Sequence, residues 1–250
     1  MTGFLASVSN LHEAEIVLAA GADIVDLKDP ANGALGALSP QTIAHIVRSL
    51  GGRVTISATT GDLPAEPAVL SHAVEATAAT GVDIVKVGLF GRDHHARCIA
   101  AMSEHAGRGV RLVAVMFADQ QPDLALIDEL SSAGFAGVML DTADKAGGDL
   151  RKQLNDETLR SFISRAHKHD LLAGLAGSLR TQDIPHLLAL DPDYLGFRTA
   201  LCKLSRRNGG IDREAAALVR ACIPSTAQAR ESVTTSVNGD ASSPVFPNRA

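Results

Sequence analysis

Three stretches of the sequence share one pattern: AAGADIVDL (19–27), ATGVDIVKV (79–87) and SAGFAGVML (132–140). In each, a segment with helical spacing ends at a glycine and continues into a short apolar run. Glycine is the residue that most often ends a helix in the left-handed conformation, and a short apolar run predicts a buried strand. The pattern therefore predicts the passage from a helix to a strand at three separate places, which is typical of a parallel α/β fold.

Similar apolar runs recur along most of the chain. The predicted strands are 4–9, 23–29, 53–59, 83–89, 111–117, 136–142, 171–177 and 193–199. Between them lie segments long enough for one helix and two short loops. Eight such units in a chain of 250 residues favour a single (β/α)₈ TIM barrel over an open sheet. We predict one catalytic barrel domain over residues 1–223.

The C-terminal segment, residues 224–250, has a different composition. It is rich in Ser, Thr, Pro and Asn, and it has few apolar residues before Val245 and Phe246. Such a segment cannot bury enough apolar surface to offset the entropy of ordering. It is predicted to be a disordered tail, and docking on a neighbouring subunit is the alternative.

Composition excludes several classes of function. The net charge is −5, aromatic residues make up 3% and Trp is absent, which argues against a nucleic-acid partner. Three widely spaced cysteines (Cys98, Cys202, Cys222) fit a reducing compartment. With no secretory signal and no apolar run of membrane-spanning length, we expect a cytoplasmic protein without a membrane partner. A homo-oligomer is an open expectation from the base rate for cytosolic enzymes.

Charged residues stand near the ends of four predicted strands. Asp26 and Lys28 lie on the second strand, Lys86 on the fourth, Asp141 on the sixth and Arg198 on the eighth. Barrel active sites lie at this end, and one interior layer takes its side chains from alternate strands, so these groups can converge. Solvated charges at strand ends are the alternative, which suits Lys28 better than Lys86, because Lys86 lies within an apolar run.

Two converging lysines suggest carbonyl chemistry. An amine attacks a carbonyl only when it is unprotonated, and a free lysine has a pKa of about 10.4. Burial or a second ammonium lowers that pKa and gives a nucleophile for Schiff-base formation. Asp26 and Asp141 could orient the amines or act as acid and base.

A phosphate site is predicted on the last two strands. Gly177 and Ser178 follow the seventh strand, and Arg198 and Thr199 end the eighth, where barrels often bind phosphate. His94 and His95 are predicted to start a helix rather than to bind a metal. For Ser57, Thr59 and Asp62, lining of the site and support of a loop are equally good explanations. No cofactor and no metal are predicted.

The motifs resemble those of the (5-formylfuran-3-yl)methyl phosphate synthases, which make the furan precursor of methanofuran. The resemblance runs over about residues 4–222 and rests on these stretches: ADIVDLKDPANGALGA (22–37), ISATTGDLP (56–64), DIVKVGLFG (83–91), MLDTADK (139–145), LAGSLRTQDIP (175–185) and GFRTALCKLSRRNGGI (196–211).

This resemblance implies a condensation of two molecules of glyceraldehyde 3-phosphate with loss of phosphate and water, without a cofactor, and a role in one-carbon metabolism. It implies that Lys28 is the Schiff-base lysine and Lys86 the proton acceptor. It implies catalytic roles for Asp141 and Lys145, and Lys145 is chosen on the resemblance alone. Our hypothesis is that the Lys28 imine of one triose, in its ketone form, becomes an enamine that attacks the aldehyde of the second triose.

Two other functions stay open at this point. One is a different lysine-dependent phosphosugar aldolase or decarboxylase, because Asp26 and Lys28 resemble the Asp-x-Lys pair of orotidine-phosphate-type decarboxylases. Those sites carry an acid three residues after the lysine, where this chain has Ala31. The other is a non-catalytic barrel that binds a phosphorylated metabolite.

Overall fold

The computed structural model describes residues 1–91, 94–144 and 147–224. Eight parallel strands form a closed barrel in chain order, which confirms the predicted TIM barrel. Each observed strand overlaps a predicted one. The strands are β1 (Gly3–Val8), β2 (Ile24–Leu27), β3 (Thr55–Thr59), β4 (Ile84–Leu89), β5 (Leu112–Phe117), β6 (Gly137–Asp141), β7 (Leu172–Leu175) and β8 (Tyr194–Phe197).

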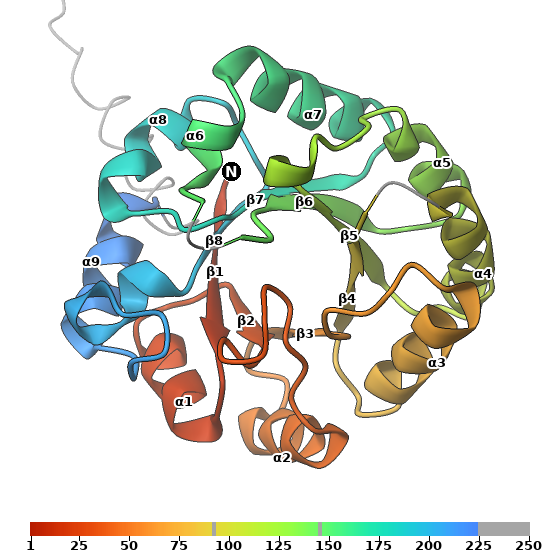
Figure 1. Cartoon of the computed structure of the whole chain (residues 1–250). Coiled ribbons are helices and arrows are strands. Elements are labelled where there is room, and N and C mark those ends of the chain that lie inside the picture. The colour runs from red at the N-terminus through yellow and green to blue at the C-terminus, as the bar shows by residue number, and fades with distance from the viewer. Residues whose placement is uncertain (92–93, 145–146, 225–250) are drawn as a thin grey trace, which may run out of the picture.

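Helices surround the barrel as an outer ring (Figure 1). They are α1 (Leu11–Ala19), α2 (Pro40–Leu50), α3 (Pro67–Ala78), α4 (His95–Gly107), α5 (Leu126–Ser132), α6 (Leu150–Gln153), α7 (Asp156–Lys168), α8 (Ile184–Leu188) and α9 (Arg213–Cys222). Short 3₁₀ turns are η1 (Ala118–Gln120), η2 (Thr181–Asp183), η3 (Thr199–Leu201) and η4 (Lys203–Ser205). α4 begins at His95, so His94 and His95 start a helix as predicted.

The three repeated stretches each end a helix as their glycines predicted. Gly21, Gly81 and Gly134 have φ of 86°, 86° and 81°, in the left-handed region that favours glycine. In the first two stretches an aspartate follows two residues later. Asp23 accepts a hydrogen bond from the N–H of Phe4 at 2.7 Å, and Asp83 accepts one from Ile56 at 2.7 Å. These carboxylates thus anchor the N-terminal end of one strand to the start of the next.

The inside of the barrel changes character along its axis. Its lower layers are apolar and include Leu5, Ile84, Val113, Met139 and Tyr194, all buried. Successive inward positions lie two residues apart, so β2 places Asp26 above Ile24 and β4 places Lys86 above Ile84. The polar side chains therefore lie toward the C-terminal ends of the strands, over an apolar floor.

The outer core fills the space between strands and helices with buried aliphatic and aromatic side chains. No helix in the described part of the chain is long and apolar enough to span a lipid bilayer. From residue 225 on, the predicted tail lies outside the described residues.

Candidate active site

Lys86 and Asp26 form a buried ion pair inside the barrel. The Nζ atom of Lys86 lies 3.1 Å from Oδ1 of Asp26, and their side chains are 2% and 0% exposed. Ser7 of β1 donates to Oδ2 of Asp26 at 2.9 Å, and Ser57 of β3 donates to Oδ1 at 2.7 Å. Neighbouring strands thus fix the carboxylate that holds Lys86.

The surroundings of Asp26 favour its ionised form. Burial alone would raise the pKa of Asp26, but the charges of Lys86 and Lys28 and the hydrogen bond from Ser57 lower it below its ordinary value of 3.8. A fully buried carboxylate is tolerated only with such partners. Asp26 is therefore a fixed negative charge beneath both lysines.

Lys28 lies next to a second carboxylate. Its Nζ is 3.8 Å from Oδ2 of Asp141 and 3.5 Å from the carbonyl oxygen of Ala34. Asp141 accepts a hydrogen bond from the backbone N–H of Thr142 at 2.7 Å through Oδ1. Lys28 and Asp141 are both almost fully buried. The two lysines thus pair with different carboxylates, Lys86 with Asp26 and Lys28 with Asp141.

The loop after β2 (residues 28–39, here the β2 loop) is held in place by β3 and the segment that follows it. Asp62 accepts hydrogen bonds from the N–H groups of Ala34 at 2.8 Å and Leu35 at 2.6 Å. A side chain at Gly33, where φ is 106°, would collide with this carboxylate. Thr59 donates to the carbonyl of Gly36 at 3.2 Å. Of the two explanations for Asp62 and Thr59, the structure favours support of the loop, whereas Ser57 contacts the site through Asp26.

Most of the predicted site residues border one small cavity of about 20 Å³, here the inner cavity. Its lining residues include Lys28, Lys86, Asp141, Gly177, Ser178, Arg198 and Thr199. Asp26 lies beneath it, fully buried. The cavity has room for about one water molecule, so substrate entry requires side chains or loops to move. Lys145 lies outside the described residues.

The segment after β7 has a backbone suited to an anion. Gly177 and Ser178 both have positive φ, 108° and 52°. Their N–H groups donate to no backbone acceptor within the described ranges. N–H groups without a backbone acceptor at the end of a barrel strand are a common phosphate site. The predicted role of Gly177 and Ser178 fits this geometry and stays a prediction.

Arg198 has a different local role from the one its position suggested. Its guanidinium donates to both carboxylate oxygens of Glu13, at 2.6 and 3.2 Å, and to the carbonyls of Ser7, Arg207 and Gly209. These bonds use all five N–H donors of an arginine. Arg198 therefore fixes the loop after β8 to α1. Direct phosphate binding by Arg198 stays a prediction, and it would require one of these bonds to be exchanged.

Sequence reasoning missed Glu13 and Arg207. Glu13 has the signature of an ordinary first-turn acid in α1, and nothing local to it indicates a partner on β8. Arg207 lies in the loop after β8 (residues 198–212, here the β8 loop) and borders the inner cavity. The signal that could have found it is its place in a cationic loop after the last strand, where barrels often bind phosphate.

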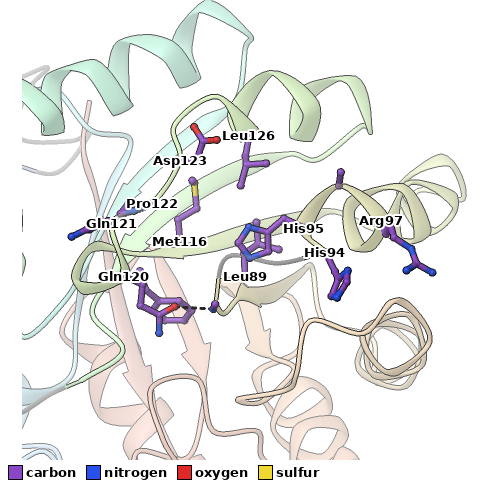
Figure 2. Close-up of a pocket in the computed structure, with 13 residues that line it drawn as sticks. Leu89, His94, His95, Arg97, Met116, Gln120, Gln121, Pro122, Asp123 and Leu126 are labelled. Atoms are coloured by element: carbon purple, nitrogen blue, oxygen red, sulfur yellow. Dashed lines mark hydrogen bonds between the residues drawn. The ribbon is translucent and has the colours of Figure 1, made fainter.

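A larger cavity, of about 480 Å³, lies elsewhere on the rim, between the ends of β4 and β5 and the starts of α4 and α5. Figure 2 shows His95, Met116 and Leu126 around this rim cavity. The Gly91 N–H donates to Oε1 of Gln120 at 3.0 Å. Among its described lining residues there is no lysine. In the described part of the chain, no cluster of three or more His, Cys, Asp or Glu could hold a metal ion.

Comparison with known proteins identifies the family. The profile of the 4-HFC-P synthases matches residues 4–220. The chain belongs to the 4-HFC-P synthase family. A (5-formylfuran-3-yl)methyl phosphate synthase of Methanopyrus kandleri is 36% identical over 220 residues, covering 84% of this chain and 93% of the relative. The counterpart in Methanocaldococcus jannaschii is 35% identical over 223 residues, covering 84% and 94%.

A protein of Methylorubrum extorquens, provisionally assigned the same activity, is 42% identical over 209 residues, covering 83% of this chain and 86% of the relative. The chain is thus a (5-formylfuran-3-yl)methyl phosphate synthase, which makes a precursor of methanofuran. The family and the activity predicted from the motifs are confirmed.

Solved structures of other enzymes share the fold. A phosphoribosyl anthranilate isomerase of Thermus thermophilus matches with a TM-score of 0.64 at 15% identity, covering 89% of this chain and 98% of that structure. A 3-hexulose-6-phosphate synthase matches with a TM-score of 0.63 at 16% identity, covering 88% and 100%. At these identities the likeness of the 4-HFC-P synthase to both structures is one of fold alone.

Proposed function

We propose that this 4-HFC-P synthase joins two triose phosphates through an imine on Lys28, with Lys86 as the base. The observation that carries this proposal is the asymmetry of the two buried lysines. Lys86 lies 3.1 Å from the carboxylate of Asp26, which two serines fix, whereas Lys28 lies 3.8 Å from the carboxylate of Asp141. An amine beside a carboxylate at the border of the cavity suits a nucleophile that must bond to carbon, because the carboxylate can take the proton that the amine loses. The amine paired with Asp26 suits a group that gives up a proton and then takes one back, because Asp26 stabilises its ammonium form before and after.

The carbon skeleton of the product requires a different carbon–carbon bond from the one in our sequence-based hypothesis. In (5-formylfuran-3-yl)methyl phosphate, the ring carbon that carries the phosphate-bearing arm is bonded to three carbons. Attack of a ketose enamine on an aldehyde gives an unbranched chain and cannot make that carbon. The new bond must instead form at the carbonyl carbon of the ketose. The imine therefore belongs on the aldose.

The proposed reaction begins at Lys28. The amine of Lys28 adds to the aldehyde of glyceraldehyde 3-phosphate. Water leaves with a proton from the Lys86 ammonium, which turns the imine into an iminium and leaves Lys86 as a neutral amine. Lys86 takes the proton from the neighbouring carbon, and the electron pair expels phosphate from the third carbon. The second glyceraldehyde 3-phosphate isomerises to dihydroxyacetone phosphate, and the enol attacks the ketone of that molecule through the third carbon of the first triose. Ring closure, loss of two waters and hydrolysis of the imine release the furan aldehyde and free Lys28.

Asp141 and the predicted Lys145 are proposed to assist the proton transfers at Lys28. Asp141 lies beside Nζ of Lys28, so it can accept a proton as the carbinolamine forms and return it as water leaves. Gly177 and Ser178 are proposed to bind the phosphate of the aldose, because they border the same cavity as Lys28.

Borohydride trapping tests this assignment. The enzyme is incubated with glyceraldehyde 3-phosphate, reduced, digested and analysed by mass spectrometry. The expected label lies on Lys28, is absent without substrate, and is absent together with furan formation in Lys28→Ala. Lys86→Met serves as the matched control, since it should keep the label while furan formation falls by about 10²- to 10⁴-fold, the usual contribution of a general base.

The alternatives predict other outcomes. A lysine that only donates a proton, as in the decarboxylase alternative, would give no label at all. A label on a lysine other than Lys28 would overturn the assignment of the nucleophile but not the activity.

A further inference from the structure

Arg207 separates two spaces at the mouth of the barrel. One is the inner cavity at Lys28 and Lys86. The other, here the outer cleft, has about 520 Å³ and lies between the β2 loop and the β8 loop. Its described lining residues are Pro30, Ala31, Gly33, Ala34, Asp62, Ala143, Arg206, Arg207 and Asn208. Among the described residues, Arg207 alone borders both spaces.

The position of Arg207 is fixed by its backbone. Its carbonyl oxygen accepts a hydrogen bond from Nε of Arg198 at 3.0 Å, and the carbonyl of Gly209 accepts one from Nη2 of Arg198 at 3.0 Å. Arg198 is itself held by the buried carboxylate of Glu13. The Arg198–Glu13 pair thus acts as a positioning device that presents Arg207 to the site.

The guanidinium of Arg207 has only neutral partners in the described part of the chain. Nε donates to the carbonyl of Pro30 at 3.3 Å and Nη2 to that of Gly33 at 2.8 Å. Nη1 has no hydrogen-bond acceptor there, and no carboxylate lies within ion-pair distance. Burial lowers the pKa of Arg207, while the more distant charge of Asp141 raises it. An arginine nevertheless keeps its charge, so a half-buried cation lacks an anionic partner at the mouth of the site.

We infer that Arg207 binds the phosphate of the second triose, the ketose, in a subsite at the outer cleft. A guanidinium with free donors is the side chain best suited to a phosphate. The negative charge in this cleft, Asp62, is directed to the backbone N–H groups of Ala34 and Leu35. This inference rests on the proposed function, which needs two phosphorylated substrates at once.

The order of binding assigns the ketose to the outer cleft. The aldose binds covalently to Lys28, in the cavity that Gly177 and Ser178 also border. The ketose enters afterwards and has to approach the imine from outside. Arg207 lies on that path, since it borders the inner cavity on one side and the outer cleft on the other.

The test compares ¹³C-labelled dihydroxyacetone phosphate with ¹³C-labelled dihydroxyacetone as the second substrate, at saturating unlabelled glyceraldehyde 3-phosphate. The readout is the labelled furan product by mass spectrometry, because glyceraldehyde 3-phosphate alone also gives furan. Because charge-assisted hydrogen bonds contribute about 1.5–3 kcal/mol, Arg207→Gln is expected to lower kcat/KM for dihydroxyacetone phosphate by about 10- to 150-fold. For dihydroxyacetone, kcat/KM should stay within about 2-fold, since that substrate has no phosphate to lose contact with. Arg207→Lys, which keeps the charge, should recover part of the loss.

Lys203→Gln is the matched control, because Lys203 is an exposed cation of the same loop that borders neither space. It should leave both kcat/KM values unchanged. Equal losses with both ketoses in Arg207→Gln would overturn the inference in favour of a structural or chemical role. No loss with either ketose would also overturn it.

A binding measurement separates this inference from the proposed function. Calorimetry with inorganic phosphate is expected to give two sites per chain in the parent and one in Arg207→Gln. If the parent made no furan from triose phosphates, the proposed function would fail, and the phosphate titration would still decide the role of Arg207. An unchanged number of sites in Arg207→Gln would refute that role.

Discussion

The rim cavity and the inner cavity differ in both size and content. The rim cavity, between β4 and β5, has about 480 Å³ and a floor of apolar side chains such as Met116 and Leu126. The inner cavity has about 20 Å³ and is bordered by two lysines, a carboxylate and two arginines. Buried charges are costly and persist only where partners compensate them. In this barrel, the cavity bordered by paired charged side chains is therefore a better candidate for the active site than the cavity of larger volume.

Among the variants that test this comparison, Asp26→Ala is expected to have the largest effect. Asp26→Ala leaves the ammonium of Lys86 buried without its carboxylate, which should lower the free energy of unfolding by about 3–5 kcal/mol. The double variant Asp26→Ala/Lys86→Met removes both charges and should regain part of that loss. Urea denaturation of the two variants measures the difference. A double variant less stable than Asp26→Ala would contradict the description of this pair as mutually compensating.

A smaller effect is expected in the pH dependence of stability. The pKa of Asp26 is lowered in the folded state, so its contribution is present above the pKa of the unfolded chain. That contribution is lost as pH falls through the lower folded-state value. In Lys86→Met the main charge that lowers the pKa of Asp26 is gone. The acid unfolding midpoint should therefore move to higher pH, as followed by circular dichroism. An unchanged midpoint would mean that Lys86 does not control the ionisation of Asp26.

The smallest effect is expected at the rim cavity. His95→Ala and Met116→Leu alter its lining without touching a residue of the inner cavity. Both variants should make the furan product with kcat and KM within about 2-fold of the parent, because neither side chain contributes to transition-state binding in the proposed mechanism. Steady-state kinetics with glyceraldehyde 3-phosphate provide the measurement. A loss of activity comparable to that of Lys86→Met would mean that the reaction, or binding of a substrate that it requires, takes place at the rim cavity. The rim cavity would then be the better candidate for the active site.

The site residues on the strands could be predicted from the sequence because barrel geometry is periodic. Asp26, Lys28, Lys86 and Asp141 lie on or directly after even-numbered strands, and the rule that alternate strands share a layer places them together. The structure brings these groups to one place, with Lys86 paired to Asp26 and Lys28 beside Asp141. Their catalytic roles stay predictions, and Lys145 lies outside the described residues.

The roles of the site residues on the loops could not be predicted from periodicity. In the sequence, Arg198 lies where barrels often bind phosphate. In the structure, its guanidinium donates to the carboxylate of Glu13, 185 residues away. Arg207 was overlooked because nothing in RRNGG distinguishes one arginine from the other. In the structure Arg206 is exposed, whereas Arg207 is half-buried and turns to the β2 loop.

The sequence by itself determined the barrel, its strand order and the two lysines at its C-terminal end. These follow from the period of apolar residues, from glycines at helix ends and from the alternation of side chains along a strand, all of which are local. Only the tertiary structure decided which carboxylate pairs with which lysine, that Arg198 holds a loop, and that Arg207 stands between two cavities. Those outcomes depend on contacts between residues far apart in the chain, whose distances no local pattern encodes.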